Sequence, residues 1–135
     1  MRVGRVRSQK LSDEVAGTLR PYLPPGFDFA AVRIRVGVPL WAAGKPLTVT
    51  LRNTIYFAPG RFDPSSREGI ALLVHELAHV EQFHRLGLVG FTLRYLASYA
   101  ANRLRGQRPH AAYFHIPLEI AARERASLFD DPTHA

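Results

Sequence analysis

The scarcity of strand-like segments constrains the fold of this chain most, because only two segments have the pattern of a β-strand. Val32 to Val38 alternates apolar residues with arginine and glycine, which is the period of a half-buried strand. Residues 47–57 are rich in Thr, Val, Ile and aromatic residues. They are expected to form one bent strand, or a hairpin that turns near Arg52 and Asn53. The sequence therefore predicts a small sheet.

One helix is predicted before these strands and another after them. The first spans Leu11 to Tyr22, with Ser12 as its N-cap. The second runs to about Leu86, and Gly87 follows it as a residue that tolerates a left-handed helix end. Its start is expected either at Asp63, as a cap before Pro64, or at a capping box of Ser65 and Glu68.

Two further helices are predicted after Gly87. One covers residues 91–105, and the other runs from Pro117 toward Leu128. The inward face of helix 91–105 is expected to consist of Leu93, Leu96, Ala97, Ala100 and Leu104. The order of helix, strands and three helices predicts an α+β fold in one domain, residues 1–135. Residues 1–62 hold the first helix and the sheet, and residues 63–135 hold the later helices, which carry the candidate metal ligands described below.

Composition narrows the class of protein. The chain has 135 residues, a formal net charge of +7 and no cysteine. Disulfide scaffolds, thiolate metal sites and cysteine nucleophiles are therefore excluded. No segment has the length and apolar character of a transmembrane helix or a signal peptide, so a cytoplasmic location is expected. The basic residues are dispersed along the chain, and a nucleic-acid partner is not expected.

The residues best suited to metal chemistry form the motif His75-Glu76-Leu77-Ala78-His79 in the second predicted helix. Histidines four residues apart project from the same helix face, so both imidazoles can bind one metal ion. Glu76 is offset so that its carboxylate can reach a water held by the metal. Burying these polar groups on an apolar helix without a partner would be costly, and a metal ion removes that cost.

A catalytic zinc site has three protein ligands, so a third must be found. The spacing H-E-x-x-H-x-x-G-x-x-H is absent, which excludes metzincins. Glu119 and Glu124 both qualify by their distance along the chain. Glu119 lies in the first turn of a helix that begins at Pro117, where the helix dipole favours a carboxylate.

The motif and the later glutamate carry a family resemblance. His75 to His79, followed by Pro117-Leu118-Glu119, resembles the gluzincin layout of zinc metallopeptidases. More narrowly, residues 72–82 together with Pro117-Leu118-Glu119 resemble a small bacterial family of metallopeptidase-like domains, largely of unknown function. That family includes the core domain of contractile injection system-associated proteins. The resemblance covers about residues 53 to 125.

The resemblance implies a zincin-like fold, in which a small twisted sheet packs against the motif-bearing helix. It implies one zinc ion per chain, bound by His75, His79 and Glu119, with Glu76 as the catalytic base. Many gluzincins have an acidic residue four positions after the glutamate ligand, where this chain has Arg123. Orientation of the ligands is then expected from Glu124 or a backbone carbonyl. Candidates for stabilising the oxyanion of the intermediate are Tyr113, His110 and His115.

The resulting hypothesis is a zinc-dependent metallopeptidase that hydrolyses a peptide or protein substrate through a zinc-bound water. Residues Thr54 to Ala58 are expected at the sheet edge, where an extended peptide can add as a strand. One alternative is a non-catalytic, zinc-stabilised interaction module. Another is binding of nucleic acid or an anionic membrane by residues 91–108, whose aromatics Phe91, Tyr95 and Tyr99 repeat every fourth position. That aromatic stripe is more typical of a packing face.

Overall fold

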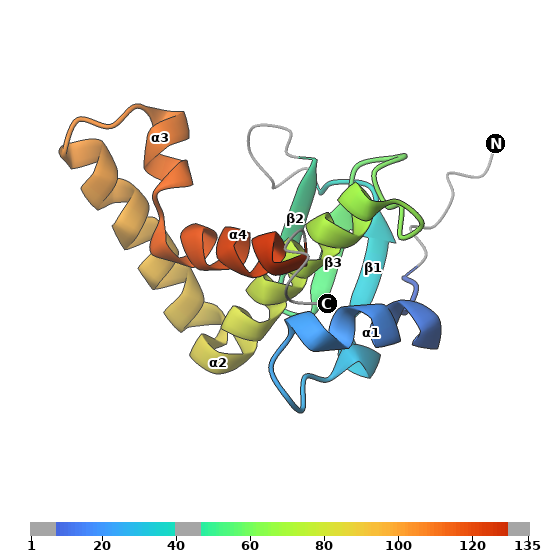
Figure 1. Cartoon of the computed structure of the whole chain (residues 1–135). Helices are drawn as coiled ribbons and strands as arrows, with labels where there is room; N and C mark the ends of the chain where they lie inside the picture. The colour runs from blue at the N-terminus through green and yellow to red at the C-terminus, as the bar shows by residue number, and fades with distance from the viewer. Residues whose placement is uncertain (1–7, 40–46, 130–135) are drawn as a thin grey trace.

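The computed structural model describes residues 8–39 and 47–129 and confirms the α+β fold. In chain order (Figure 1) the elements are α1 (Asp13–Leu19), the short 3-10 helices η1 (Arg20–Tyr22) and η2 (Phe29–Ala31), β1 (Arg33–Val36), β2 (Thr48–Leu51), β3 (Thr54–Phe57), α2 (Arg67–Leu104), α3 (Pro109–Phe114) and α4 (Pro117–Phe129). In this part of the chain no helix is both long and apolar enough to cross a bilayer.

The three strands form a mixed sheet in the order β1-β3-β2. β2 and β3 form the predicted hairpin, and Arg52 adopts a left-handed φ of 57° at its turn. β1 runs parallel to β3 on the other side. The prediction that Thr54 to Ala58 lies at the sheet edge is therefore wrong. β3 contains Ile55 and Phe57, which are almost fully buried, and pairing on both sides removes their backbone from water.

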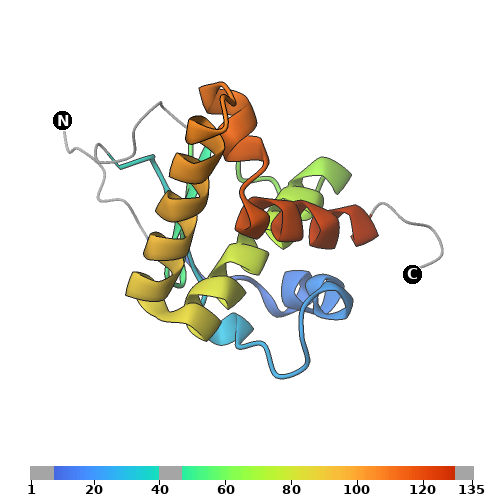
Figure 2. The same cartoon turned by 90° about the vertical axis from the view of Figure 1, so that its left-hand side faces the viewer.

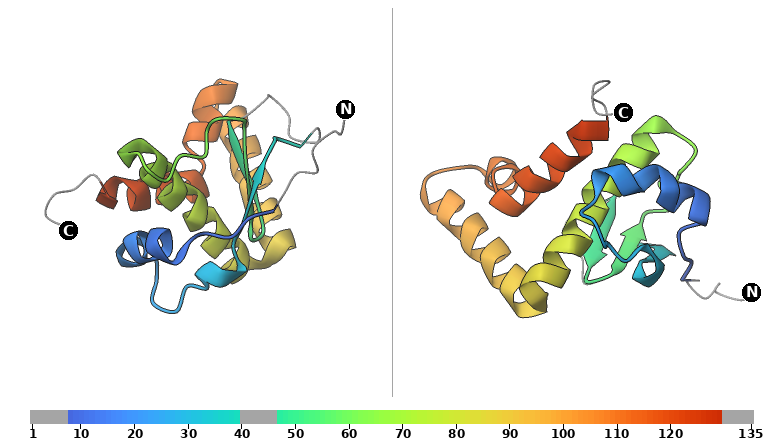
Figure 3. Two further views of the ribbon diagram at one scale, coloured as in Figure 1. Left: turned by 90° about the vertical axis from the view of Figure 1, so that its right-hand side faces the viewer. Right: turned by 60° about the horizontal axis from the view of Figure 1, so that its bottom comes forward.

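The first half of α2 lies between the sheet and α4. Figures 2 and 3 show the strands on one side of this helix and α4 on the other. Leu73, Val74 and Leu77 pack in one core with Ile34 of β1, among the side chains of the strands and α1. The C-terminal end of α4 is held against η1, because Arg125 donates a hydrogen bond to the Tyr22 carbonyl at 3.0 Å. The first half of α2 is thus covered on both faces, by the sheet and by α4, which makes it the central element of the fold.

α1 has the predicted N-cap, whereas the start of α2 differs from both predicted caps. Ser12 accepts a hydrogen bond from the Val15 amide. In α2 the N-cap is Ser66, whose hydroxyl accepts from the Gly69 amide at 2.9 Å. Asp63 instead accepts from the Ser65 amide at 3.1 Å. Its carboxylate closes the preceding turn, so the helix begins three residues later than an Asp63 cap would place it.

Gly87 interrupts α2 with a φ of 73° and a ψ of 166°, as its predicted role at a helix end requires. The chain then continues as a second helical segment, residues 88–104, which we call the arm. Phe83 and Phe91 stack across the break with their ring centroids 3.7 Å apart. Asn102, near the end of the arm, donates a hydrogen bond to the Ala112 carbonyl at 2.9 Å and so holds α3, an element not predicted.

The prediction for the inward face of the arm is wrong. Leu93, Leu96 and Leu104 are 64, 58 and 89% exposed, and Ala97 and Ala100 are exposed as well. The aromatic stripe faces inward instead, beginning with the buried Phe91. The aromatic rings, which recur at every fourth position, fill the space between the arm and the rest of the molecule. The leucines lie on the opposite side of the helix. The leucines are left in solvent because no described element covers them.

Gly69 provides a test of how α2 begins. A Cβ at this position would overlap the backbone carbonyl oxygen of Asp63. We expect Gly69→Ala to lower the free energy of unfolding by about 2 kcal/mol or more, as overpacking does. Gly17→Ala is the control, because its Cβ meets nothing within 4 Å in α1. That change should be neutral or stabilising by about 0.5 kcal/mol in urea denaturation. Equal effects of the two substitutions would contradict this packing.

Candidate metal centre

Two helices bring three ligand-type side chains to one point. His75 and His79 project from the same face of α2, one turn apart, and Glu119 comes from the first turn of α4. One ligand atom from each lies within 4.8 Å of the others. The Nε2 atom of His79 is 2.6 Å from Oε1 of Glu119, and Nε2 of His75 is 3.5 Å from Oε2. We call this set of three residues the His-Glu cluster.

The cluster is largely buried, and its charges stabilise one another. The side chains of His75, His79 and Glu119 are 18, 7 and 4% exposed. Burial alone would raise the pKa of the Glu119 carboxyl, but hydrogen bonds from both histidines outweigh it and hold that pKa well below its usual range. Burial would likewise lower the pKa of His79, but the contact with Glu119 outweighs it and raises that pKa. The ionised forms of both groups are therefore favoured.

Gln82 orients His79. Nε2 of Gln82 donates to the Leu118 carbonyl at 2.9 Å, so its Oε1 faces Nδ1 of His79 at 2.9 Å as an acceptor. Nδ1 of His79 therefore carries a proton, and Nε2 points at Glu119. Gln82 was not identified from the sequence as an orienting residue. Its position three residues after His79, on the same helix face, was the available signal.

Glu76 is held by the edge of the sheet. Its two carboxylate oxygens accept hydrogen bonds from the hydroxyls of Thr48 and Thr50, each at 2.7 Å. Sequence reasoning missed both threonines. They alternate on β2 and therefore share one face of the strand, but only the packing of β2 against α2 shows which carboxylate they meet. Glu76 is thus buried beside the cluster, and each of its carboxylate oxygens accepts a hydrogen bond.

Tyr113 is the one candidate oxyanion stabiliser in contact with the cluster. Its hydroxyl donates to Oε2 of Glu119 at 3.0 Å. Burial, together with the charge of Glu119, raises the pKa of the Tyr113 hydroxyl. The hydroxyl therefore stays protonated and remains a hydrogen-bond donor at neutral pH. Tyr95 lies behind it, with the ring centroids 6.5 Å apart.

The structure leaves the other candidates away from the cluster. Glu124 is exposed on α4, because five residues of helix turn it away from Glu119. His115 is exposed and contacts Gln107, and the ring of His110 stacks on Phe114. The guanidinium of Arg123 lies 3.7 Å above that same Phe114 ring and joins α4 to α3. Glu124 is therefore turned away from the cluster, whereas Gln82 forms a hydrogen bond with His79.

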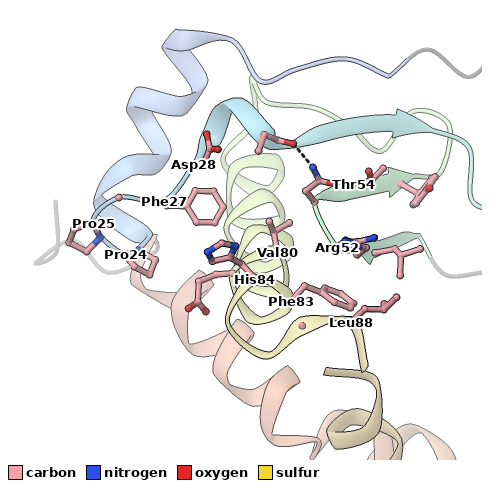
Figure 4. Close-up of a pocket in the computed structure, with 17 residues that line it drawn as sticks. Pro24, Pro25, Phe27, Asp28, Arg52, Thr54, Val80, Phe83, His84 and Leu88 are labelled. Atoms are coloured by element: carbon pink, nitrogen blue, oxygen red, sulfur yellow. Dashed lines mark hydrogen bonds between the residues drawn. The ribbon is translucent and has the colours of Figure 1, made fainter. Parts of the chain in front are cut away.

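A cavity of about 470 Å³ opens beside the cluster. Its wall includes Thr48, His75, Glu76 and Tyr113, so this side of the cluster is reachable from solvent. A larger groove of about 800 Å³ lies between the hairpin turn and the last turns of α2 before Gly87 (Figure 4). Its wall includes Arg52 and His84 but none of the His-Glu cluster.

The donor set fits a transition metal. Two imidazole nitrogens and one carboxylate oxygen are the ligands of catalytic zinc sites that keep a fourth position open. A hydrogen bond from the second ring nitrogen, as His79 makes to Gln82, is the usual support of a ligating histidine. Magnesium and calcium prefer oxygen donors throughout. These residues therefore suit a transition-metal ion better than magnesium or calcium.

One comparison with known proteins gives a match. A family model for the eCIS core domain matches residues 11–86, which include His75, Glu76 and His79. The match begins earlier in the chain than the resemblance noted from the sequence, and it ends before Glu119. No curated protein and no solved structure matches significantly. The position of Glu119 at the cluster is thus a result of the tertiary structure and is independent of the family match.

The contact between His79 and Glu119 predicts a pH dependence in the metal-free protein. The pKa of His79 should lie above the usual value of about 6.5, because Glu119 stabilises the imidazolium. The stability that this contact contributes is present below that usual value and is lost as the pH rises through the raised pKa. Nitrogen-detected NMR of the histidine ring measures the titration. Glu119→Gln should lower the pKa, and Glu124→Gln should leave it unchanged. A pKa insensitive to Glu119→Gln would exclude the contact.

Proposed function

The chain belongs to the eCIS core domain family, and we propose that it binds one zinc ion through His75, His79 and Glu119 and acts as a peptidase. The observation that carries the proposal is the convergence of two imidazoles and a buried carboxylate from two helices within 4.8 Å. Burying three polar side chains at a helix contact is costly unless they are paired or bind a metal. The adjoining cavity gives this cluster a solvent-facing side.

Each side chain has a separable role in this proposal. Zinc, when bound, polarises a substrate carbonyl and lowers the pKa of a water molecule. Glu76 accepts the proton of the attacking water and passes it to the leaving amine, as a general base and then acid. The single O–H of Tyr113, which donates to Glu119 at 3.0 Å in this structure, would turn from Glu119 to donate to the developing oxyanion. Gln82 fixes the ring of His79.

The substrate is proposed to be an extended peptide. β2 is an edge strand, and no further strand pairs with its outer side within residues 8–39 and 47–129. Its free backbone groups can pair with a peptide by strand addition. Thr48 of β2 lines the cavity together with His75 and Glu76, so a peptide on this edge passes the cluster. β2 therefore takes the place that the sequence had suggested for residues 54–58.

One observation favours the alternative of a non-catalytic zinc-binding module. Both oxygens of Glu76 accept hydrogen bonds from Thr48 and Thr50, and these bonds hold the carboxylate on β2, away from free rotation toward a water. In a module this contact would be permanent and would hold β2 on α2. In a peptidase it positions the carboxylate before substrate binds. The substitution of Glu76 described below separates the two functions.

Zinc affinity tests the identity of the third ligand. Glu119→Gln should weaken zinc binding by about 100-fold or more, because it removes a charged ligand at the buried cluster. Glu124→Gln makes the same chemical change on the same helix, five residues away and exposed, and should change affinity less than about threefold. Competition with a zinc-binding dye measures both. A larger loss in the Glu124 variant would overturn the assignment.

Cleavage assays test the role of Glu76. Glu76→Gln should retain zinc, since Glu76 is not a ligand, and should lower kcat by about 100-fold or more on a mixture of synthetic peptides. His75→Ala should lose both zinc and activity. Full turnover by Glu76→Gln would refute the proposed base. Zinc binding without cleavage by the unsubstituted protein would identify the chain as the non-catalytic module.

A further inference from the structure

The arm carries an apolar face that no described element covers. Val89 is 69% exposed, and Leu93, Leu96 and Leu104 are 64, 58 and 89% exposed. At 100° per residue the apolar side chains form a stripe about 100° wide along the helix. We call this stripe the outer face of the arm; it consists of Val89, Leu93, Leu96, Ala97, Ala100 and Leu104. It lies opposite the aromatic residues that face the His-Glu cluster.

Basic residues border this face, and acidic residues are absent from it. On the same helical projection Arg94 lies about 100° to one side of Leu93, and Arg103 about 80° to the other. Residues 82–118 contain no aspartate or glutamate, but they include five arginines, Arg85, Arg94, Arg103, Arg105 and Arg108. The acidic residues of the described chain all lie outside the arm. The arm is thus an apolar stripe between two positively charged borders.

We propose that the outer face of the arm docks on an anionic lipid bilayer, with the helix lying in the plane of the interface. Leucines on one face and arginines along its borders are the pattern of a helix that inserts its apolar side below the headgroups. The long arginine side chains can keep their guanidinium groups at the level of the lipid phosphates. The exposed apolar area is then removed from water without a matching protein surface.

The charge pattern selects this occupant over a second copy of the chain. Two arms packed face to face would place arginines against arginines, with no acidic side chain in residues 82–118 to pair with them. The shape agrees with a bilayer as well. None of the outer-face residues lines either of the cavities described above, and the face is the exposed, convex side of a helix. A convex helix face of leucines with basic borders fits an anionic bilayer, because the fluid lipids can move to accommodate it.

Docking by this face leaves the His-Glu cluster undisturbed. The inner face of the arm holds Phe91, whose ring meets His79 edge to face at 6.0 Å. Phe91 also stacks on Tyr95. These contacts lie on the opposite side of the helix from the leucines. The cluster and its cavity would therefore be carried beside the membrane with their internal contacts unchanged.

Sedimentation with vesicles of equal parts phosphatidylserine and phosphatidylcholine tests the proposal with the full chain. We expect binding to these vesicles, little binding to phosphatidylcholine alone, and a loss of binding as salt is raised. The double variant Leu93→Gln/Leu96→Gln should weaken binding about tenfold or more. Arg94→Gln should weaken it about fivefold, and Arg94→Lys should restore it.

The controls lie outside the arm. Leu128→Gln changes an exposed leucine of α4, and Arg35→Gln changes an exposed arginine of β1. Both should bind vesicles like the unsubstituted protein. All variants should keep their helical circular dichroism and their zinc affinity, so this test is independent of the proposed function. Equal binding to neutral vesicles, or binding insensitive to the arm substitutions, would overturn the proposal. So would a dimer in solution that the leucine variants abolish, because a second copy would then cover the face.

Discussion

The buried carboxylate of Glu119 is the interaction on which the arrangement of the helices depends. A carboxylate 4% exposed is stable only if its charge is paired, and here donors from three residues meet it. His75 and His79 come from α2, and Tyr113 comes from α3. Because one group holds these elements against α4, it sets how closely the two long helices approach. Gln82 adds a second tie by bonding both His79 and the Leu118 carbonyl.

The same helix that carries the motif also connects the cluster to the sheet. Glu76 is one residue after His75, so it faces β2 while His75 faces Glu119 of α4. The threonines of β2 complete its hydrogen bonds, which removes the cost of burying a second carboxylate at this place. α2 therefore presents polar side chains to both of its neighbours, histidines to α4 and Glu76 to β2. A small three-stranded sheet suffices for this, because only one strand has to reach the motif.

Gly87 divides the molecule into a body and an arm. A left-handed φ at this position turns the chain, and the stacking of Phe83 on Phe91 fixes the direction of the turn. The turn brings aromatic rings over the cluster and leaves leucines in water. An exposed leucine face is unfavourable in an isolated molecule, and its arginine borders favour a negatively charged surface as the place where it is buried.

The sequence by itself determined the local elements and the helical part of the site. The Ser12 cap, the strand periods, the hairpin turn and the break at Gly87 follow from preferences that act over a few residues. The same holds for the proximity of His75 to His79, because one turn of helix fixes it. The choice of Glu119 over Glu124 was favoured by its place in a first turn.

Only the tertiary structure decided which surfaces meet. Strand order is set by pairing between distant segments, and so it placed β3 in the centre and gave Glu76 the two threonines of β2. The arm has apolar residues on two sides, leucines on one and aromatics on the other. The periodicity of the sequence alone cannot tell which of the two sides becomes buried. The aromatic side was buried because the turn at Gly87 directs it toward α3 and the cluster, where large rings fill the space. Contacts between segments far apart in the chain depend on the whole packing, which no local pattern encodes.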